Sequence, residues 1–414
     1  MLNHYSGRVK APASKSCCLR ALICSLLTED KHNITISNIS LCDDVLSGIK
    51  LISKIESFSY IIEDKNIIFT NNNDQNQEKA GNNFDVGESG FLARVFVSLG
   101  SYFYPDFNLR GKGTLLKRDL AIEEFAKKVG LFASSSFIPA TIQGAVKPGN
   151  FTISENNSSQ FLSGLLFLLP LLNEDSIIHI ESIVSKPYID LTLSYLKRSG
   201  IQFDWISKNE LEIPGNQKYC VNNLTPESDW SSLSYLIVLG ILAGDVVITD
   251  IIDSPALPDR VILDLLNEVG GDYSFLDKKT LQVKKSQIRG FTFDLTPNPD
   301  LAPVLVALAL SATSPSLLKG CHRLRNKESD RLLSIINMLK TLNVKYTYQD
   351  DVLTIIPRKI MGGVIRTYGD HRIAMTALIL NSISENKITI DNYECINKSY
   401  PEFLDDLKKL GAEK

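Results

Sequence analysis

The sequence predicts an α/β protein built from repeated strand–helix units. Short β-rich runs alternate with helix-length runs that are apolar or amphipathic, and the β-rich runs include residues 33–40, 176–182, 245–251 and 387–393. Several apolar runs pass through a small polar turn into such a strand at intervals of roughly 60 to 75 residues, which indicates internal repeats. Alternation of this kind is typical of α/β folds.

The bulk composition sets the broad class of the protein. The chain has 414 residues, enough for two or three ordinary domains. Its 44% hydrophobic and 22% charged residues are typical of a soluble globular protein. A net charge of −3 argues against a nucleic-acid-binding protein with a broad basic surface, but it allows a concentrated positive cleft.

The seven cysteines show no paired CxxC spacing, so we expect free thiols in a reducing compartment and no zinc site. We also expect no signal peptide. The longest apolar stretch, residues 161–172, contains a proline and is too short to span a bilayer. The sequence therefore predicts a cytoplasmic protein without membrane contact.

Two polar segments interrupt the repeating pattern. The Asn-rich residues 71–83 predict a surface loop. The polar residues 222–229 separate two repeated halves, and we expect a domain boundary there.

The first candidate site lies at a helix start, in the sequence APASKSCCLRA. Ser14 is a suitable N-cap, whereas Lys15 opposes the helix dipole but is well placed to bind an anion. Ser16 and Arg20 are four residues apart and share a face of the helix. These groups would serve one phosphate, and the alternative interpretation is a solvated helix start.

Polar residues precede two further helices in the first half of the chain. Gly90 would let backbone amides approach a ligand, with Arg94 in the first turns of the helix. Ser158, Ser159 and Gln160 directly precede an apolar helix. One serine is expected to cap that helix, which leaves a hydroxyl and an amide for a phosphate or a polyol.

The sequence SKPYID marks another helix start, because proline is favoured in the first turn. Ser185 and Tyr188 would contact a ligand there, although Tyr188 would equally suit half-buried packing. Asp300 comes just before a strongly apolar helix and is either an N-terminal cap or a functional carboxylate.

Charged residues gather at the last helix starts. Lys327, Glu328 and Arg331 belong to a charge-rich turn, which is usually a solvated face. The triplet at 370–372 abuts an apolar helix, where its charges must pair or bind something. Lys398 precedes the terminal amphipathic helix. If these helix starts converge, they form a positive cleft in which Asp300 and Glu328 are candidates for proton transfer.

Nine short motifs, in this order along the chain, resemble the 5-enolpyruvylshikimate-3-phosphate synthases, the 3-phosphoshikimate 1-carboxyvinyltransferases. The motifs are PxSKSxxxR (12–20), GxxGxxxR (87–94), SSQFL (158–162), SKPYID (185–190), DxSSxSY (229–235), PDLA (299–302), KESDRL (327–332), YGDHRIAM (368–375) and KSYPEF (398–403). The resemblance implies two domains, each of three βαβαββ repeats in an inside-out α/β barrel, with the active site in the cleft between them. The expected domains are residues 14–225, and residues 1–13 plus 226–414.

The resemblance also implies the roles of the site residues. It assigns catalysis to Asp300, Glu328 and Lys15. It assigns shikimate 3-phosphate binding to Lys15, Ser16, Arg20, Ser158, Ser159, Gln160, Ser185, Tyr188, Asp300 and Lys327. It assigns phosphoenolpyruvate binding to Lys15, Gly90, Arg94, Gln160, Arg331, Arg372 and Lys398, since guanidinium groups suit a carboxylate.

The implied reaction is an addition–elimination through a tetrahedral intermediate, with no metal and no organic cofactor. Glu328 is the candidate group for the C3 proton of phosphoenolpyruvate, Asp300 for the 5-hydroxyl of shikimate 3-phosphate, and Lys15 for the leaving phosphate. The expected partners are these two small molecules, with no nucleic acid, and the expected state is a monomer.

The chain departs from the family pattern at two turns. Thr114 stands where the family pattern has an arginine, and Lys112 is a candidate to supply the missing charge. Glu88 stands near the proposed phosphate site and would repel a phosphate unless it is turned away. These departures leave open a non-catalytic anion-binding relative with the same fold. The other alternative is the sister transferase that acts on UDP-N-acetylglucosamine, although its family has an asparagine where this chain has Ser16 and a reactive cysteine that residues 111–120 lack.

Overall fold

The computed structural model describes residues 4–30, 34–56, 59–70, 81–154, 158–181, 186–254 and 257–411. It divides into two compact units. We call Lys15–Pro226 the continuous unit, and Met1–Ser14 together with Glu227–Lys414 the split unit. Each unit is described below by itself.

The described strands of the continuous unit form sheets with one repeated plan. The strand orders are β13-β2-β4-β3, β5-β6-β8-β7 and β9-β10-β12-β11. In each sheet the first two strands are parallel and the others are antiparallel. The strands are β2 (Thr35–Ile36), β3 (Ser59–Glu63), β4 (Asn66–Thr70), β5 (Asn83–Asp85), β6 (Asp106–Arg110), β7 (Phe132–Ala133), β8 (Ala140–Gln143), β9 (Asn150–Ile153), β10 (Ser176–Ile180), β11 (Asp204–Trp205), β12 (Glu210–Ile213) and β13 (Asn223–Leu224).

The split unit repeats this plan in the orders β1-β14-β16-β15 and β17-β18-β20-β19, and it adds the parallel pair β21-β22. The strands are β1 (Tyr5–Lys10), β14 (Gly244–Thr249), β15 (Asp272–Asp277), β16 (Thr280–Lys284), β17 (Thr292–Asp294), β18 (Ser316–Lys319), β19 (Lys345–Gln349), β20 (Val352–Ile356), β21 (Gly363–Ile365) and β22 (Ile388–Ile390). The recurrence of one α/β unit along the chain confirms the repeats that the sequence predicts.

Helices connect the strands of each unit. The α-helices of the continuous unit are α1 (Lys15–Leu27), α2 (Asp43–Glu56), α3 (Gly90–Phe103), α4 (Ile122–Lys128), α5 (Ser158–Leu168) and α6 (Lys186–Arg198). Those of the split unit are α7 (Trp230–Ala243), α8 (Ile262–Val269), α9 (Ala302–Leu310), α10 (Arg331–Thr341), α11 (His371–Leu380) and α12 (Phe403–Lys409). The 3-10 turns are η1 (Gly113–Lys117), η3 (Leu169–Leu171), η4 (Pro258–Val261), η5 (Pro299–Leu301), η6 (Cys321–Leu324) and η7 (Glu394–Lys398).

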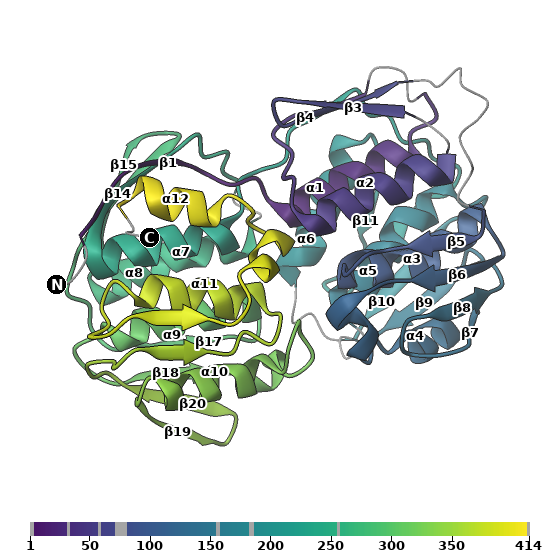
Figure 1. Ribbon diagram of the computed structural model, residues 1–414. Helices are drawn as coiled ribbons and strands as arrows, with labels where there is room; N and C mark the ends of the chain where they lie inside the picture. Colours follow the sequence, from purple (N-terminus) through teal and green to yellow (C-terminus); the bar gives the residue numbers. More distant parts are fainter. Residues whose placement is uncertain are drawn as a thin grey trace. The chain divides into compact units, whose positions relative to one another are not determined.

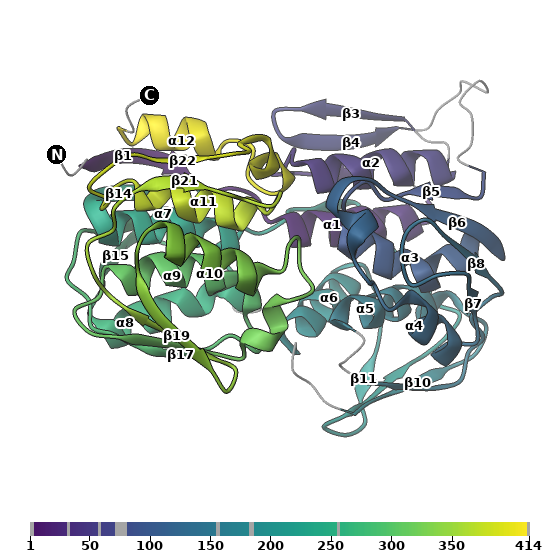
Figure 2. The same cartoon turned by 60° about the horizontal axis from the view of Figure 1, so that its bottom comes forward.

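The core of the split unit is made of helices that are buried on all sides. Helices α7, α9 and α11 pack against one another and lie inside the strands of that unit (Figures 1 and 2). Every residue of α9 and α11 is buried, as is every residue of α7 except Ser231. A helix buried all round has no polar face. Accordingly, α7 and α9 contain no charged residue, and Arg372 of α11 lies in its first turn.

In the continuous unit, α3 and α5 pack closely at Gly164. A Cβ added there would lie 2.6 Å from the backbone oxygen of Val95 and 2.6 Å from the hydroxyl of Ser98. Only glycine lets the two backbones approach this closely. The same helices carry Arg94 and Gln160, so this contact fixes the distance between two candidate site residues.

The chain passes between the two units at residues that pair with each other. The Ser14 N–H donates to the Glu227 carbonyl at 2.8 Å, and Ala13 forms a bridge with Ser228. Strand β1 then completes a sheet of the split unit by pairing with β14.

The described strands confirm the four β-rich runs of the sequence, since β2, β10 and β22 lie within them and β14 begins one residue before its run. The predicted surface loop is wrong at its last residue, because Asn83 begins β5, which pairs in parallel with β6. Residues 71–80 of that loop lie outside the described residues. In the part of the chain that the structure describes, no helix is long and apolar enough to cross a membrane.

Candidate active site

In the continuous unit, α1 begins at Lys15, directly after Ser14 as the sequence predicts. The Lys15 ammonium lies 3.0 Å from a carboxylate oxygen of Asp44, which is buried in the first turn of α2. The Lys15 side chain is 16% exposed. The ion pair therefore holds a mostly buried ammonium at the start of α1.

Arg20 is buried and links α1 to α6. Its guanidinium donates to the Thr192 hydroxyl at 2.9 Å and to the backbone oxygens of Ser16 at 2.9 Å and Tyr188 at 3.2 Å. Burial lowers the pKa of Arg20. The structure thus brings Ser16, Arg20 and Tyr188 together around one guanidinium.

A second group in the continuous unit surrounds Gly90, the first residue of α3. Arg94 donates to the Gln160 side-chain oxygen at 2.9 Å. A Cβ added at Gly90 would lie 3.3 Å from one guanidinium nitrogen of Arg94 and 3.6 Å from one of Arg118. Two guanidinium groups therefore flank the backbone at the start of this helix. Arg118 was missed by the sequence analysis.

Glu88 organises the turn that carries Arg118. Its carboxylate accepts the Thr114 N–H at 2.8 Å, and the Thr114 hydroxyl accepts from Arg118 at 2.7 Å. Gly113 has φ +59°, and a Cβ there would overlap the Glu88 carboxylate. The negative charge of Glu88 thus points into turn η1.

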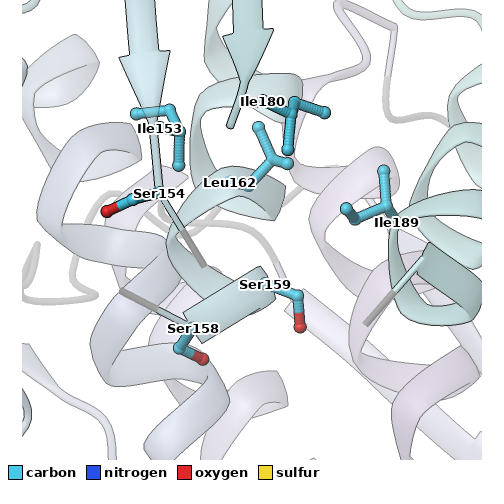
Figure 3. Close-up of a pocket in the computed structure, with 7 residues that line it drawn as sticks. All are labelled: Ile153, Ser154, Ser158, Ser159, Leu162, Ile180 and Ile189. Carbon is cyan, nitrogen blue, oxygen red and sulfur yellow. The ribbon is translucent and has the colours of Figure 1, made fainter. Parts of the chain in front are cut away.

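Ser158 and Ser159 line a pocket at the start of α5 (Figure 3). The Ser158 hydroxyl accepts the Gln160 N–H at 3.3 Å, which is the capping role expected for one of the two serines. Figure 3 shows the two serines on one side of the pocket and Ile153 and Ile180 on the other. The space of about 280 Å³ among these residues includes open solvent, so the pocket is a shallow one. Ser185, another predicted site residue, lies outside the described residues.

In the split unit, Asp300 is the centre of a charged cluster, which we call the Asp300 cluster: Asp300, Lys327, Glu328, Arg331, Asp370 and Arg372. Asp300 lies in turn η5, and its carboxylate is 2.8 Å from Arg331, 3.2 Å from Arg372 and 3.5 Å from Lys327. The residues directly before turn η5 and helix α9 are Asn298 and Leu301. The side-chain contacts of Asp300 are therefore ion pairs and not those of a helix cap.

Arg331 holds the other carboxylates of the cluster. Its guanidinium lies 2.6 Å from Glu328 and 2.9 Å from Asp370, and its side chain is fully buried. Asp370 also caps α11 by accepting the Arg372 N–H at 3.0 Å. The charges at 370–372 are therefore paired, as their burial requires.

The cluster shifts the pKa values of its members. Burial alone would raise the pKa of Asp300, but Arg372, Lys327 and Arg331 outweigh it and hold that pKa well below its usual range. Burial alone would lower the pKa values of Arg331 and Arg372, but the neighbouring carboxylates outweigh it and raise both. Burial is the largest cause that lowers the pKa of Lys327. Asp300 is thus an anion held among cations.

Lys398 is buried at the end of η7, a turn that packs against α11. The described residues contain no group of three or more His, Cys, Asp and Glu side chains placed to hold a metal ion. All seven cysteines are described and are free thiols. The described site residues thus form groups within each unit, made of cations, hydroxyls and two candidate proton-transfer carboxylates.

Comparison with known proteins agrees with this chemistry. The family model described as EPSP synthase (3-phosphoshikimate 1-carboxyvinyltransferase) matches residues 2–407. A 3-phosphoshikimate 1-carboxyvinyltransferase of Clostridium kluyveri is 32% identical over 412 residues, covering 98% of this chain and 95% of the relative. One of Clostridium acetobutylicum is 34% identical over 415 residues, with the same coverage, 98% and 95%.

Solved structures show the same fold. The EPSP synthase of Acinetobacter baumannii has a TM-score of 0.80 at 20% identity and covers 99% of this chain and 96% of its own. The enolpyruvyl transferase NikO of Streptomyces tendae has a TM-score of 0.73 at 15% identity, with 99% and 96% covered. The predicted enolpyruvyl-transferase type of α/β fold is thereby confirmed. With the match of the family model over nearly the whole chain, the protein belongs to the EPSP synthase family, the 3-phosphoshikimate 1-carboxyvinyltransferases.

Proposed function

We propose that the chain transfers the enolpyruvyl group of phosphoenolpyruvate to the 5-hydroxyl of shikimate 3-phosphate and releases phosphate. This reaction belongs to the shikimate pathway, which leads to chorismate and the aromatic amino acids. Family membership supports the assignment. The observation that carries it is the Asp300 cluster, where Asp300 and Glu328 share the buried Arg331 guanidinium and Asp300 also pairs with Arg372.

Both units contribute residues to the proposed active site. Phosphoenolpyruvate binds to Arg331, Arg372 and Lys398 of the split unit, and to Lys15, Gly90, Arg94 and Gln160 of the continuous unit. Shikimate 3-phosphate binds to Lys15, Ser16, Arg20, Ser158, Ser159, Gln160, Ser185, Tyr188, Asp300 and Lys327. Arg118 joins the phosphoenolpyruvate group, because its guanidinium flanks Gly90 beside Arg94. In this role it supplies the charge that Thr114 lacks, in place of Lys112.

The proposed addition step forms one bond and moves two protons. The 5-hydroxyl oxygen attacks C2 of phosphoenolpyruvate, Asp300 accepts the hydroxyl proton, and Glu328 delivers a proton to C3. The Arg331 and Arg372 guanidinium groups neutralise the substrate carboxylate in a fixed geometry. A tetrahedral adduct results.

The proposed elimination step reverses the proton transfer at C3. Glu328 takes a proton back from C3, the C2–O bond to phosphate breaks, and a new C2–C3 double bond forms. Lys15 stabilises the leaving phosphate, and Asp300 passes the hydroxyl proton on to this phosphate, which its low pKa favours. Both carboxylates thereby return to their starting charge. The chain's own side chains thus account for every proton of the reaction.

The decisive experiment measures phosphate release from phosphoenolpyruvate by the purified chain. We expect release that depends on shikimate 3-phosphate and does not occur with UDP-N-acetylglucosamine. Release with UDP-N-acetylglucosamine alone would identify the sister activity. No release with either acceptor, from a folded protein, would identify a non-catalytic relative.

We also propose that the enzyme acts as a cytoplasmic monomer. All candidate site residues are on one chain, and the free thiols suit a reducing compartment. Size-exclusion chromatography with light scattering checks the monomer, and a dimer whose separation abolishes turnover would contradict it.

A further inference from the structure

One sequence motif has no part in the proposed reaction, the DxSSxSY segment at 229–235. Its Ser231 is in the first turn of α7 and is the residue of that helix that is not fully buried. The Ser231 hydroxyl accepts from the Arg372 guanidinium at 3.3 Å and donates to a carboxylate oxygen of Asp259. Asp259 is 4% exposed and lies in turn η4. A buried carboxylate thus reaches the Asp300 cluster through one hydroxyl.

The other oxygen of Asp259 accepts a hydrogen bond from a different element. Asn298 donates to it at 3.1 Å and to the Pro258 backbone oxygen at 2.8 Å. Asn298 directly precedes turn η5, which carries Asp300 two residues later. The single carboxylate of Asp259 is therefore connected to both partners of the Arg372–Asp300 ion pair.

We propose that Asp259 is a positioning residue for the Arg372–Asp300 pair. Through Ser231 and Asn298, its carboxylate holds the guanidinium and turn η5 in the geometry that binds phosphoenolpyruvate. Protonation of Asp259 weakens this hold, because a neutral acid attracts the guanidinium less and places an additional hydrogen among donors. The inference rests on the proposed function, since Arg372 is assigned there to phosphoenolpyruvate.

The charges around Asp259 place its protonation in an accessible pH range. Burial raises the pKa of Asp259 to about 6, and the repulsion of Asp300 adds to this, while Ser231, Arg372 and Asn298 oppose it. Asp229 at the start of α7 helps to raise the pKa of Arg372, and Arg260, which follows Asp259 in η4, pairs with Asp253.

The sign of the effect on stability follows from this raised pKa. Ionisation of Asp259 is less favourable in the folded chain than in the unfolded chain, whose carboxyl has the ordinary value of 3.8. Folding stability is therefore lost through this group as the pH rises from 3.8 to about 6. Asp259→Asn removes that loss, so we expect the variant to fold.

The test compares kcat/KM for phosphoenolpyruvate in the wild type and Asp259→Asn between pH 5 and 8. The substrate phosphates also titrate near pH 6, but this titration is common to both proteins and cancels in their ratio. We expect the wild type to exceed the variant about tenfold at pH 8, as for a lost charged hydrogen bond, and the ratio to approach 1 at pH 5. The pH dependence of the ratio reports the carboxylate itself.

Asp406→Asn is the matched control, because Asp406 is a buried carboxylate of the same unit, bonded to Tyr400 and Lys409 at 2.8 Å each. The ratio of kcat/KM in the wild type to kcat/KM in Asp406→Asn should not change with pH. A constant ratio for Asp259→Asn, whatever its size, would overturn the inference and leave the proposed function intact. Absence of turnover in the wild type would overturn both the positioning role of Asp259 and the proposed function.

Substitutions of Ser231 test the hydrogen-bonded connection from Asp259 to Arg372 without changing a charge. We expect Ser231→Ala to raise KM for phosphoenolpyruvate roughly fivefold with little change in kcat, as for one lost hydrogen bond. Ser231→Thr keeps the hydroxyl and should restore the wild-type KM. Equal KM values in the wild type and Ser231→Ala would overturn the connection.

Discussion

Arg331 shows how single residues set the chemistry of this protein. Its guanidinium has no exposed surface and meets Asp300, Glu328 and Asp370. A buried charge of this kind depends on each partner, because removing one leaves a charge without compensation. Arg331 therefore holds both candidate proton-transfer carboxylates, Asp300 and Glu328, in place.

Glu328 gives the clearest prediction at this scale. Glu328→Gln keeps an acceptor for Arg331 but cannot carry the C3 proton. We expect kcat to fall by roughly 10²–10⁴-fold, the usual contribution of general acid–base catalysis, with circular dichroism unchanged.

Glu268→Gln is the control for Glu328→Gln, since Glu268 is an exposed residue of α8. Its turnover should equal that of the wild type. Turnover of Glu328→Gln at the wild-type rate would remove Glu328 from the mechanism.

The sequence predicted that the charges at 370–372 pair or bind something, because buried charges must be compensated, and Asp370 and Arg372 are found in ion pairs. It missed Arg118, although Thr114 and Arg118 are four residues apart and such spacing brings side chains together in a helical turn. It also missed Asp259, because the contacts of Asp259 come from Ser231 and Asn298, which are distant in sequence. Long-range contacts of single side chains leave no local pattern.

At the scale of elements, turn η1 depends on a side chain outside it. Glu88 accepts the Thr114 N–H, and Thr114 in turn holds Arg118. We expect Glu88→Ala to release Arg118 and raise KM for phosphoenolpyruvate about fivefold, equivalent to about 1 kcal/mol for one hydrogen bond. Glu88→Gln retains an acceptor and should stay near the wild-type KM. A similar KM in all three proteins would show that the turn does not need Glu88.

The contact between α3 and α5 gives a prediction about stability. Gly164→Ala would press a methyl group against the Val95 backbone oxygen. We expect the free energy of unfolding to fall by about 1–3 kcal/mol, as in other overpacked cores, measured by urea denaturation.

Gly48→Ala in α2 is the comparison for Gly164→Ala, because its nearest neighbour is the end of the flexible Leu19 side chain at 2.9 Å. This neighbour can move, and alanine favours a helix over glycine by about 1 kcal/mol. The decrease in the free energy of unfolding should therefore be smaller than for Gly164→Ala. An equal decrease would contradict the role of the backbone contact.

Element types were predictable from sequence, whereas some pairings were not. The β-rich runs of β10, β14 and β22 are recognisable because apolar and polar residues alternate or cluster over several positions. Strands β2 and β13 have two residues each, so nothing local indicates that they pair. Their partnership depends on the rest of the continuous unit.

At the scale of the whole molecule, the continuous unit has the sheets of a self-sufficient domain. All strand partners of its described strands lie within it. We expect residues 15–226, expressed alone, to give a cooperative thermal transition by circular dichroism. We expect no turnover from this piece, because Glu328 is in the split unit.

The two segments of the split unit can be expressed as one piece if a short linker joins Ser14 to Glu227. The backbones of these two residues are hydrogen-bonded at 2.8 Å. This piece should also fold and should also lack turnover, because Lys15 is absent from it. Phosphate release by either piece alone would contradict an active site that needs both.

The pairing of β1 with β14 has a consequence for biosynthesis. The ribosome releases Tyr5–Lys10 long before Gly244–Thr249, and it makes the entire continuous unit in the interval. The nascent first strand therefore stays without its sheet partner while later segments are already folding. A chaperone that recognises extended segments would meet β1 during translation, and its binding would end when β14 emerges.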